Sequence, residues 1–172
     1  MMRRLRAWEK PLAEAALELV SEVPRSNQVA QDAPKAASQA LARKACRQAA
    51  MASATLALVP GPMGLLTVLP DIFAVWKMQA QLVADIAAVY GKEATLTRSH
   101  MLSCLFRHTA TQAVRDMAVR SAQRYLMQRA LGSSASRYLP VIGAAGVGGY
   151  AYYDTRQVAL TAIALFDTGD GL

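Results

Sequence analysis

The stretch Pro60-Gly61-Pro62-Met63-Gly64 decides the fold, because it interrupts an uncharged run of 23 residues from Gln48 to Pro70. An unbroken apolar run of roughly 20 residues is long enough to cross a bilayer as a helix. Two prolines and two glycines within five residues break a helix. The run therefore predicts two apolar arms, each about 15 Å long, that form a hairpin. That hairpin is either a re-entrant membrane wedge or part of a buried core.

Helical patterns extend from both arms. The alanine-rich segment before the break predicts a helix that begins near Pro34 and runs toward Leu58. After the break, Pro70-Asp71 is expected to open another helix, with Asp71 at its positive N-terminal end. An apolar stripe at helical spacing follows: Ile72, Val75, Met78, Leu82, Ile86 and Val89. Gln79, Gln81 and Asp85 lie off this stripe, and Tyr90-Gly91 closes the helix.

The next predicted helix begins at Thr97 or Ser99 and extends toward Leu131. Its expected inner stripe contains Leu102, Phe106, Ala110, Ala113 and Met117. Its arginines point in several directions at 100° per residue, which argues against a single basic face for nucleic acid.

A second uncharged run extends from Tyr138 to Tyr153 and contains two pairs of small residues, Gly143 and Gly146 three positions apart and Ala144 and Gly148 four positions apart. Small residues three or four positions apart allow helix backbones to approach closely. Asp154 is expected to end this run, and a final amphipathic helix uses Val158, Ala162, Ile163 and Phe166. The predicted fold is all-α, with helical hairpins whose two apolar Gly/Pro-rich segments, 48–70 and 138–153, pack together.

Composition agrees with a helical chain and locates its charge. Alanine makes up about a fifth of the 172 residues, and the aromatic fraction is only 6%. The net charge of +7 is uneven: residues 1–50 and 92–137 are basic, whereas residues 51–91 and 138–172 are slightly acidic. The 53% apolar content excludes a disordered chain, and two cysteines exclude a disulfide scaffold.

The N-terminal 33 residues are predicted to form an amphipathic helix followed by a polar linker, separate from a helical domain at 34–172. Residues 1–6 resemble the basic region of a signal peptide, but acidic residues interrupt the apolar residues after them, so no signal peptide is expected. The expected location is the cytoplasm or the cytoplasmic side of the inner membrane, where Cys46 and Cys104 stay reduced.

The chain resembles the EcsC family over about residues 45–168, in a proteobacterial branch. The segments that carry the resemblance are Leu58-Val59-Pro60-Gly61-Pro62, Pro70-Asp71, Ile86-Ala87-Ala88-Val89-Tyr90-Gly91, Cys104-Leu105-Phe106-Arg107-His108 and Tyr150-Ala151-Tyr152-Tyr153-Asp154-Thr155. The resemblance implies an α-helical, membrane-associated bacterial protein. It supplies no catalytic residues.

Several polar residues are candidates for ligand contact. His100, Cys104 and His108 follow one another at intervals of four and line one helical face, but the outer histidines stand about 12 Å apart along the axis. Asp71 and Asp154 each end an apolar run, where an aspartate caps a helix, pairs with an arginine or holds a ligand. With Arg107, these residues form the polar candidate set. We expect no metal and no cofactor.

Tyr150, Tyr152 and Tyr153 fit either a polar pocket beside Asp154 or an aromatic anchor at a membrane interface. The glycine-rich segment 143–149 follows no strand and lacks the Gly-Lys-Ser/Thr of a phosphate loop, so close helix packing explains it better. No G-x-S-x-G or HExxH motif occurs, and no catalytic residue is predicted.

The leading functional prediction is a non-enzymatic protein that docks its apolar hairpins at the bacterial inner membrane, accessory to a transport or envelope system. Its contact residues would be Pro60, Gly61, Pro62, Met63, Gly64, Gly143, Gly146, Gly148, Tyr150, Tyr152 and Tyr153. Its partner would be anionic lipid, an integral membrane protein or a second copy of the chain, and nucleic acid is not expected. One alternative is a soluble adaptor. Another is a metal-dependent enzyme that uses Asp71, His100, Cys104, His108 and Asp154.

Overall fold

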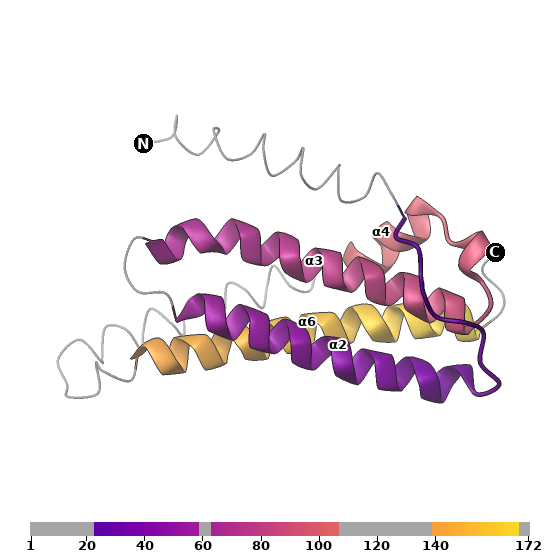
Figure 1. The fold of residues 1–172 in the computed structure, drawn as a ribbon, viewed down its shortest axis with the longest axis horizontal. Coiled ribbons are helices and arrows are strands. Elements are labelled where there is room, and N and C mark those ends of the chain that lie inside the picture. The colour runs from indigo at the N-terminus through magenta and orange to yellow at the C-terminus, as the bar shows by residue number, and fades with distance from the viewer. Residues whose placement is uncertain (1–22, 59–62, 107–138, 169–172) are drawn as a thin grey trace.

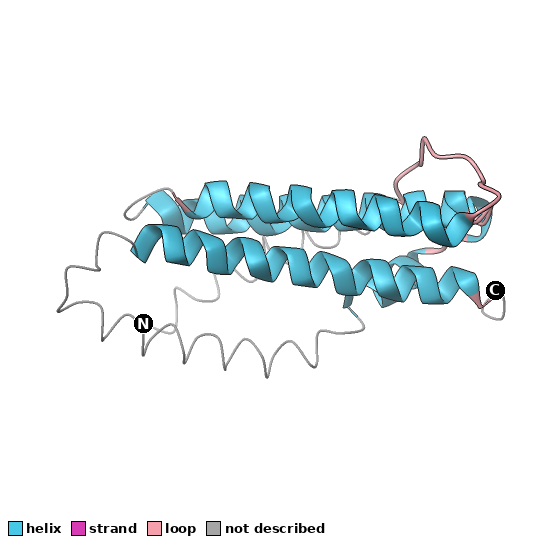
Figure 2. Cartoon of the chain, turned by 90° about the horizontal axis from the view of Figure 1, so that it is seen from below, coloured by secondary structure: helices cyan, strands magenta, loops and turns pink. Residues whose placement is uncertain are grey.

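The computed structural model describes residues 23–58, 63–106 and 139–168. Every regular element within these ranges is a helix (Figure 2). The elements are α2 (Pro34–Ala57), α3 (Met63–Val89), the 3-10 turn η1 (Glu93–Thr95), α4 (Arg98–Phe106) and α6 (Leu139–Asp167). The all-α prediction is confirmed. The three long helices lie side by side, and the shorter α4 packs against α3 and α6 (Figure 1).

The hairpin around the predicted break joins α2 to α3. α2 begins at Pro34, where a first-turn position leaves the missing N–H of proline without cost. It ends at Ala57, and α3 begins at Met63 and returns along it. Met63 and Gly64 thus belong to the first turn of α3, whereas residues 59–62, including Pro60, Gly61 and Pro62, lie outside the described residues. The predicted interruption is confirmed by the helix ends on its two sides.

The prediction that Pro70-Asp71 opens a helix is wrong. α3 begins seven residues earlier, at Met63, and continues through Pro70. Proline inside a helix loses one backbone hydrogen bond and crowds the preceding turn. The mainly apolar residues on both sides favour a continuous helix that packs along α2, and tertiary packing outweighs the local penalty. Asp71 is therefore an interior residue of α3 and does not cap it.

The other end of α3 closes as predicted at Tyr90-Gly91. The N–H of Gly91 donates to Ala88 O, and the N–H of Lys92 donates to Ala87 O. These two bonds form a Schellman motif, which requires a left-handed residue, and Gly91 has φ +69°.

The prediction that Asp154 ends the second uncharged run is wrong. Residues 139–167 form one continuous helix of 29 residues, so Asp154 lies inside it and does not end a segment. The glycine-rich run is therefore a straight half of α6 and not a hairpin of its own. It packs on the second half of α2, so the two apolar segments do lie together. Glycine is a weak helix former, and in this run the buried contact with α2 comes from Gly148 and Ala144.

The core is largest where α3 and α6 meet α4. It includes Val83 and Ile86 of α3 and Val158 and Phe166 of α6, all essentially buried. α4 buries Met101, Cys104 and Leu105, whereas Leu102 is 39% exposed. The predicted inner stripe of this helix is thus wrong at Leu102, because the buried face is turned by one residue. Residues 107–131 of that predicted helix lie outside the described residues.

Residues 23–33, which we call the strap, run beside α3 before the chain enters α2 (Figure 1). Ser26 Oγ donates to Asp85 Oδ1 over 2.7 Å, and Gln81 Nε2 donates to Arg25 O. The N–H of Gln31 donates to Val89 O at the end of α3. The polar linker predicted here is therefore held to α3 by hydrogen bonds. The helix predicted within residues 3–22 lies outside the described residues.

Candidate functional site

The first residue of the predicted His100, Cys104 and His108 face takes part in a helix cap. Thr97 precedes α4, and its Oγ1 accepts a hydrogen bond from the N–H of His100 at 3.3 Å. The imidazole Nδ1 of His100 faces back toward the N–H of Thr97 at 3.5 Å. This reciprocal pair resembles a capping box with histidine in the place of glutamate. The predicted helix start at Thr97 is confirmed, and His100 contributes to that cap.

The remainder of that face forms no metal centre in the part of the chain that the structure describes. Cys104 is fully buried in the core, and no three His, Cys, Asp or Glu residues gather at one point among the described residues. Arg107 and His108 lie outside them.

The helices place Asp71 and Asp154 at different levels of the bundle. Asp154 Oδ2 accepts a hydrogen bond of 2.6 Å from Nε2 of Gln79, and the same nitrogen lies 3.4 Å from Thr155 Oγ1. This bond places Asp154 level with Gln79 of α3. Asp71 precedes Gln79 by eight residues, about 12 Å along the helix axis. Gln79, expected off the buried stripe, is only 1% exposed, because it forms a polar contact between α3 and α6.

One predicted glycine produces a close helix contact. A Cβ atom at Gly148 would stand 2.7 Å from the backbone oxygen of Ala50 in α2, closer than any stable contact allows. Ala144, one turn earlier on the same face, is buried. Gly143 and Gly146 have nothing within 4 Å of such an atom. The close-packing prediction is thus confirmed for the Ala144–Gly148 pair and wrong for the Gly143–Gly146 pair, which lies on the exposed face of α6.

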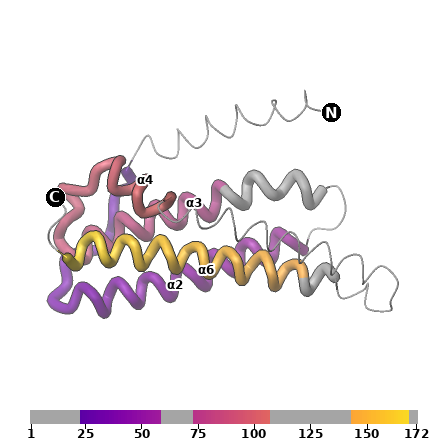
Figure 3. The backbone as a smooth tube through the Cα atoms, turned by 180° about the vertical axis from the view of Figure 1, so that it is seen from behind, coloured from indigo at the N-terminus to yellow at the C-terminus, as the bar shows by residue number. Residues whose placement is uncertain are grey.

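The contacts along the bundle fix how its helices align. Gly148 lies opposite Ala50, and Lys35 at the start of α2 bonds Asp167 at the end of α6, so these helices are antiparallel. Gln79 bonds Asp154 and, farther along both helices, Tyr90 bonds Asp167, so α3 and α6 run in the same direction. The end of α2 and the beginnings of α3 and α6 therefore meet at one end of the molecule (Figure 3).

The described residues at that end are almost without charge, and we call this part of the bundle the charge-free end. It consists of residues 48–58 of the α2 segment, 63–76 of α3 and 139–153 of α6, which together contain a single ionisable acid or base besides tyrosine, Asp71. Met51 and Leu58 are exposed there, by 72% and 48%. The sequence shows two separate uncharged runs, 48–70 and 138–153, and the helix alignment brings them together.

Two further layers follow along the axis. Aromatic residues lie where the charge-free end meets the rest of the bundle: Phe73, Trp76, Tyr150, Tyr152 and Tyr153. Tyr152 and Tyr153 are 40% and 36% exposed, and the Trp76 ring packs edge-on against Phe73 and Phe106. Beyond them is a basic collar of five exposed residues from three helices: Arg43, Lys44, Arg47, Lys77 and Arg156. Along the bundle axis, the described residues therefore form an apolar layer, then an aromatic layer and then a basic layer.

The opposite end of the bundle is polar and closed by hydrogen bonds. Asp167 binds Lys35 Nζ at 2.9 Å and accepts a bond from the Tyr90 hydroxyl at 3.2 Å. The bond from Lys35 lowers the pKa of Asp167. Burial and the adjacent Asp167 carboxylate raise the pKa of Tyr90 to about 12. Lys92 Nζ donates to Phe166 O in the last turn of α6, where a cation is favourable.

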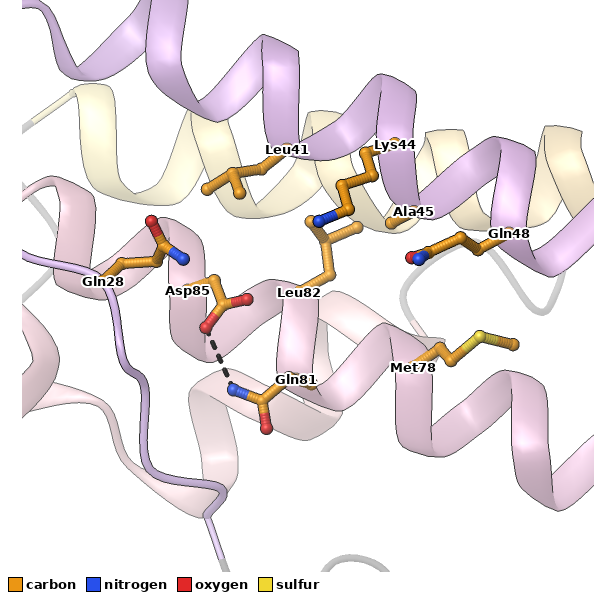
Figure 4. A pocket seen from close by; sticks show the side chains of 9 residues that line it. All are labelled: Gln28, Leu41, Lys44, Ala45, Gln48, Met78, Gln81, Leu82 and Asp85. Carbon is orange, nitrogen blue, oxygen red and sulfur yellow. Dashed lines mark hydrogen bonds between the residues drawn. The ribbon is translucent and has the colours of Figure 1, made fainter.

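A cavity of about 180 Å³ lies between α2, α3 and the strap (Figure 4). Apolar side chains form much of its surface, and polar groups come from all three segments. Its lining residues are Gln28, Leu41, Lys44, Ala45, Gln48, Met78, Gln81, Leu82 and Asp85. Sequence reasoning missed this cavity, because its two charges, Lys44 and Asp85, lie 41 positions apart and meet only through the alignment of α2 with α3.

Comparison with known proteins gives no match to a family model, to a curated protein or to a solved structure. Among the described helices, none is sufficiently long and apolar to span a membrane.

Proposed function

We propose that this chain is a non-enzymatic, membrane-associated protein that inserts its charge-free end into one leaflet of an anionic bilayer, at the cytoplasmic side of the inner membrane. The observation that carries the proposal is the layered arrangement of apolar, aromatic and basic residues along the bundle axis. The resemblance to the EcsC family over residues 45–168 implies the same association.

The dimensions of the charge-free end suit partial insertion. From Leu139 to Gly149, α6 rises about 15 Å, half of the roughly 30 Å hydrocarbon core of a bilayer. The helix interiors keep their backbone hydrogen bonds satisfied internally, which lowers the cost of moving them into an apolar phase. Exposed Met51 and Leu58 would contribute apolar area that water now covers.

The next two layers match the chemistry of the bilayer surface. Tyrosine and tryptophan favour the headgroup level, where the ring meets hydrocarbon and the polar atom meets water. Each lysine or arginine near an anionic surface contributes about 1 kcal/mol of attraction, which salt screens. The five collar residues come from three helices, so they would surround the inserted end.

Vesicle flotation tests the proposal. Wild-type protein is expected to float with vesicles that contain phosphatidylglycerol, and to lose that binding as sodium chloride is raised. Because a lysine placed in the leaflet is costly, Met51→Lys and Leu58→Lys are each expected to weaken binding by at least about tenfold, which corresponds to about 1.4 kcal/mol.

Leu102→Lys is the matched control, since Leu102 is an exposed leucine on α4, outside the charge-free end. Its vesicle binding should equal that of the wild type. Absence of wild-type flotation at low salt would contradict the proposal, as would an equal loss in the Leu102 variant. Fluorescence of Trp76 in a Trp8→Phe background gives a second readout, because lipids brominated near the headgroup should quench it most.

A further inference from the structure

We propose that the cavity between α2, α3 and the strap binds a phosphate diester that carries a primary ammonium, the chemistry of a phosphoethanolamine headgroup. This inference rests on the proposed function and names the headgroup that the docked protein would hold. It is carried by the position of the cavity and by two opposite charges that line it.

Asp85 is positioned in advance as an acceptor. Ser26 Oγ and Gln81 Nε2 both donate to its Oδ1, over 2.7 and 2.9 Å. Within the described part of the chain, no hydrogen bond reaches Oδ2, and Figure 4 shows this second oxygen turned toward the side of the cavity where Lys44 lies. The strap and α3 thus hold the carboxylate still while leaving one oxygen for a ligand.

Lys44 supplies the complementary charge. Its ammonium group reaches over the cavity from α2 (Figure 4) and forms no ion pair with Asp85. Because Lys44 and Asp85 line one cavity without contacting each other, a zwitterionic ligand can bind between them. Its negative group would face Lys44 and its positive group would face Asp85. The amide of Gln48 lies on the Lys44 side of the cavity (Figure 4) and adds a donor for phosphate oxygens there.

The order of these groups along the bundle matches a lipid entering from the charge-free end. Met78 and Gln48 line the side of the cavity nearest that end, Lys44 follows, and Asp85 lies farthest away (Figure 4). A lipid that enters from the bilayer meets these groups as glycerol, phosphate and then ammonium. The volume of about 180 Å³ is below the roughly 300–1,000 Å³ of sites for drug-sized ligands, which suits a headgroup alone.

Other common headgroups fit less well. A choline group has no N–H to donate to Asp85, and quaternary ammonium ions are usually held by aromatic rings, which this cavity does not contain. A serine headgroup would bring a second carboxylate toward Asp85. A glycerol headgroup would leave Asp85 without a cation.

The test uses vesicles with a constant fraction of phosphatidylglycerol and a remainder of either phosphatidylethanolamine or phosphatidylcholine. A charge-assisted hydrogen bond should give wild-type protein a roughly tenfold preference for the ethanolamine vesicles. Asp85→Asn retains an oxygen that accepts from Ser26 and Gln81 but removes the charge, so the preference ratio should fall to about one. Asp32→Asn, which alters an exposed carboxylate outside the cavity, should keep the ratio.

The outcomes separate this inference from the proposed function. Equal binding of wild-type protein to both vesicles would overturn the headgroup site and leave membrane docking in place, and so would a preference that survives Asp85→Asn. If no vesicle is bound, docking itself fails, and glycerophosphoethanolamine in solution tests the site alone. Shifted side-chain amide resonances of Gln28, Gln48 and Gln81 would then support a soluble ligand of the same chemistry, and unshifted resonances would overturn the site.

Discussion

The two ends of the bundle are built by different kinds of packing. At the charge-free end, α2 and α6 approach through small residues, with Gly148 against the backbone of Ala50. At the polar end, large side chains such as Phe166 and Ile86 fill the core, and hydrogen bonds join the helix ends. Small-residue contacts keep helices close without relying on a large hydrophobic core, which is how helices also associate in lipid. Under the proposed function, the charge-free end would leave water while the polar end maintains the fold.

The largest effect is expected at the polar end, from Phe166→Ala. Phe166 is 1% exposed and its ring lies 6.5 Å from that of Tyr90. Removing a buried phenylalanine costs about 3–5 kcal/mol of unfolding free energy. Leu160→Ala on the same helix, where the side chain is 46% exposed, should change it by less than about 0.5 kcal/mol. Urea denaturation of the two variants measures these changes. Equal losses of unfolding free energy in Phe166→Ala and Leu160→Ala would contradict the contrast between the buried and the exposed side chain.

The middle of the bundle is tested by Gln79→Leu. This change removes the donor to Asp154 Oδ2, and a hydrogen bond to a charged group contributes about 1.5–3 kcal/mol. Gln157→Leu, on the half-exposed face of α6, is the control and should have little effect. A gain in stability for Gln79→Leu would show that apolar packing outweighs this buried contact.

At the charge-free end, two glycines on one helix should respond with opposite signs. Gly148→Ala forces α2 and α6 apart, because the new Cβ would stand 2.7 Å from Ala50 O, and overpacking of this kind costs about 1–3 kcal/mol. Gly146→Ala meets nothing within 4 Å and should stabilise the protein by about 0.5–1 kcal/mol through helix propensity. Thermal unfolding of the pair checks this, and a shift in the same direction for both would contradict the helix alignment.

The smallest effect is a pH dependence at the polar end. Because the pKa of Tyr90 is raised to about 12, the folded state keeps a proton that the unfolded chain releases near pH 10. The contribution of the neutral Tyr90 phenol to the free energy of unfolding is thus fully present below pH 10. It is lost as the pH rises to about 12. The difference in unfolding free energy between wild type and Tyr90→Phe should narrow across this window. A difference that stays constant would exclude the linkage.

Local pattern was sufficient to predict the elements whose signals are local. Pro34 at a first turn, the break predicted at residues 60–64 and Gly91 at a helix end each act within a few residues. The structure confirms a helix start at Pro34, an interruption between Ala57 and Met63, and a helix end before Gly91. Pro70 predicted a helix start and Asp154 predicted the end of a segment from equally local patterns, and both predictions were wrong. Packing along α2 outweighed the local preference at each position. Local chemistry identifies candidate ends, and tertiary contact decides which ones occur.

The candidate site depended on information that the linear sequence does not contain. The sequence shows the uncharged segments, the tyrosines and the arginines separately. Their order along the bundle axis follows only from the antiparallel alignment of α2 with α6. The cavity needed, in addition, the strap beside α3. Gln79 was missed because a polar residue off the apolar stripe normally faces water. Its burial follows from Asp154 on a helix 75 residues away in sequence.

The pairing of α2 with α6 also has a consequence for biosynthesis. These helices form the most extensive interface among the described elements, yet about 80 residues separate the end of α2 from the start of α6. At about 5–20 residues per second, a ribosome needs several seconds to make the missing partner. Until then, the face of α2 that carries Cys46, Ala49 and Ser53 has only the α3 hairpin beside it. The nascent chain would therefore expose an apolar, alanine-rich surface that is open to chaperones or to a nearby membrane.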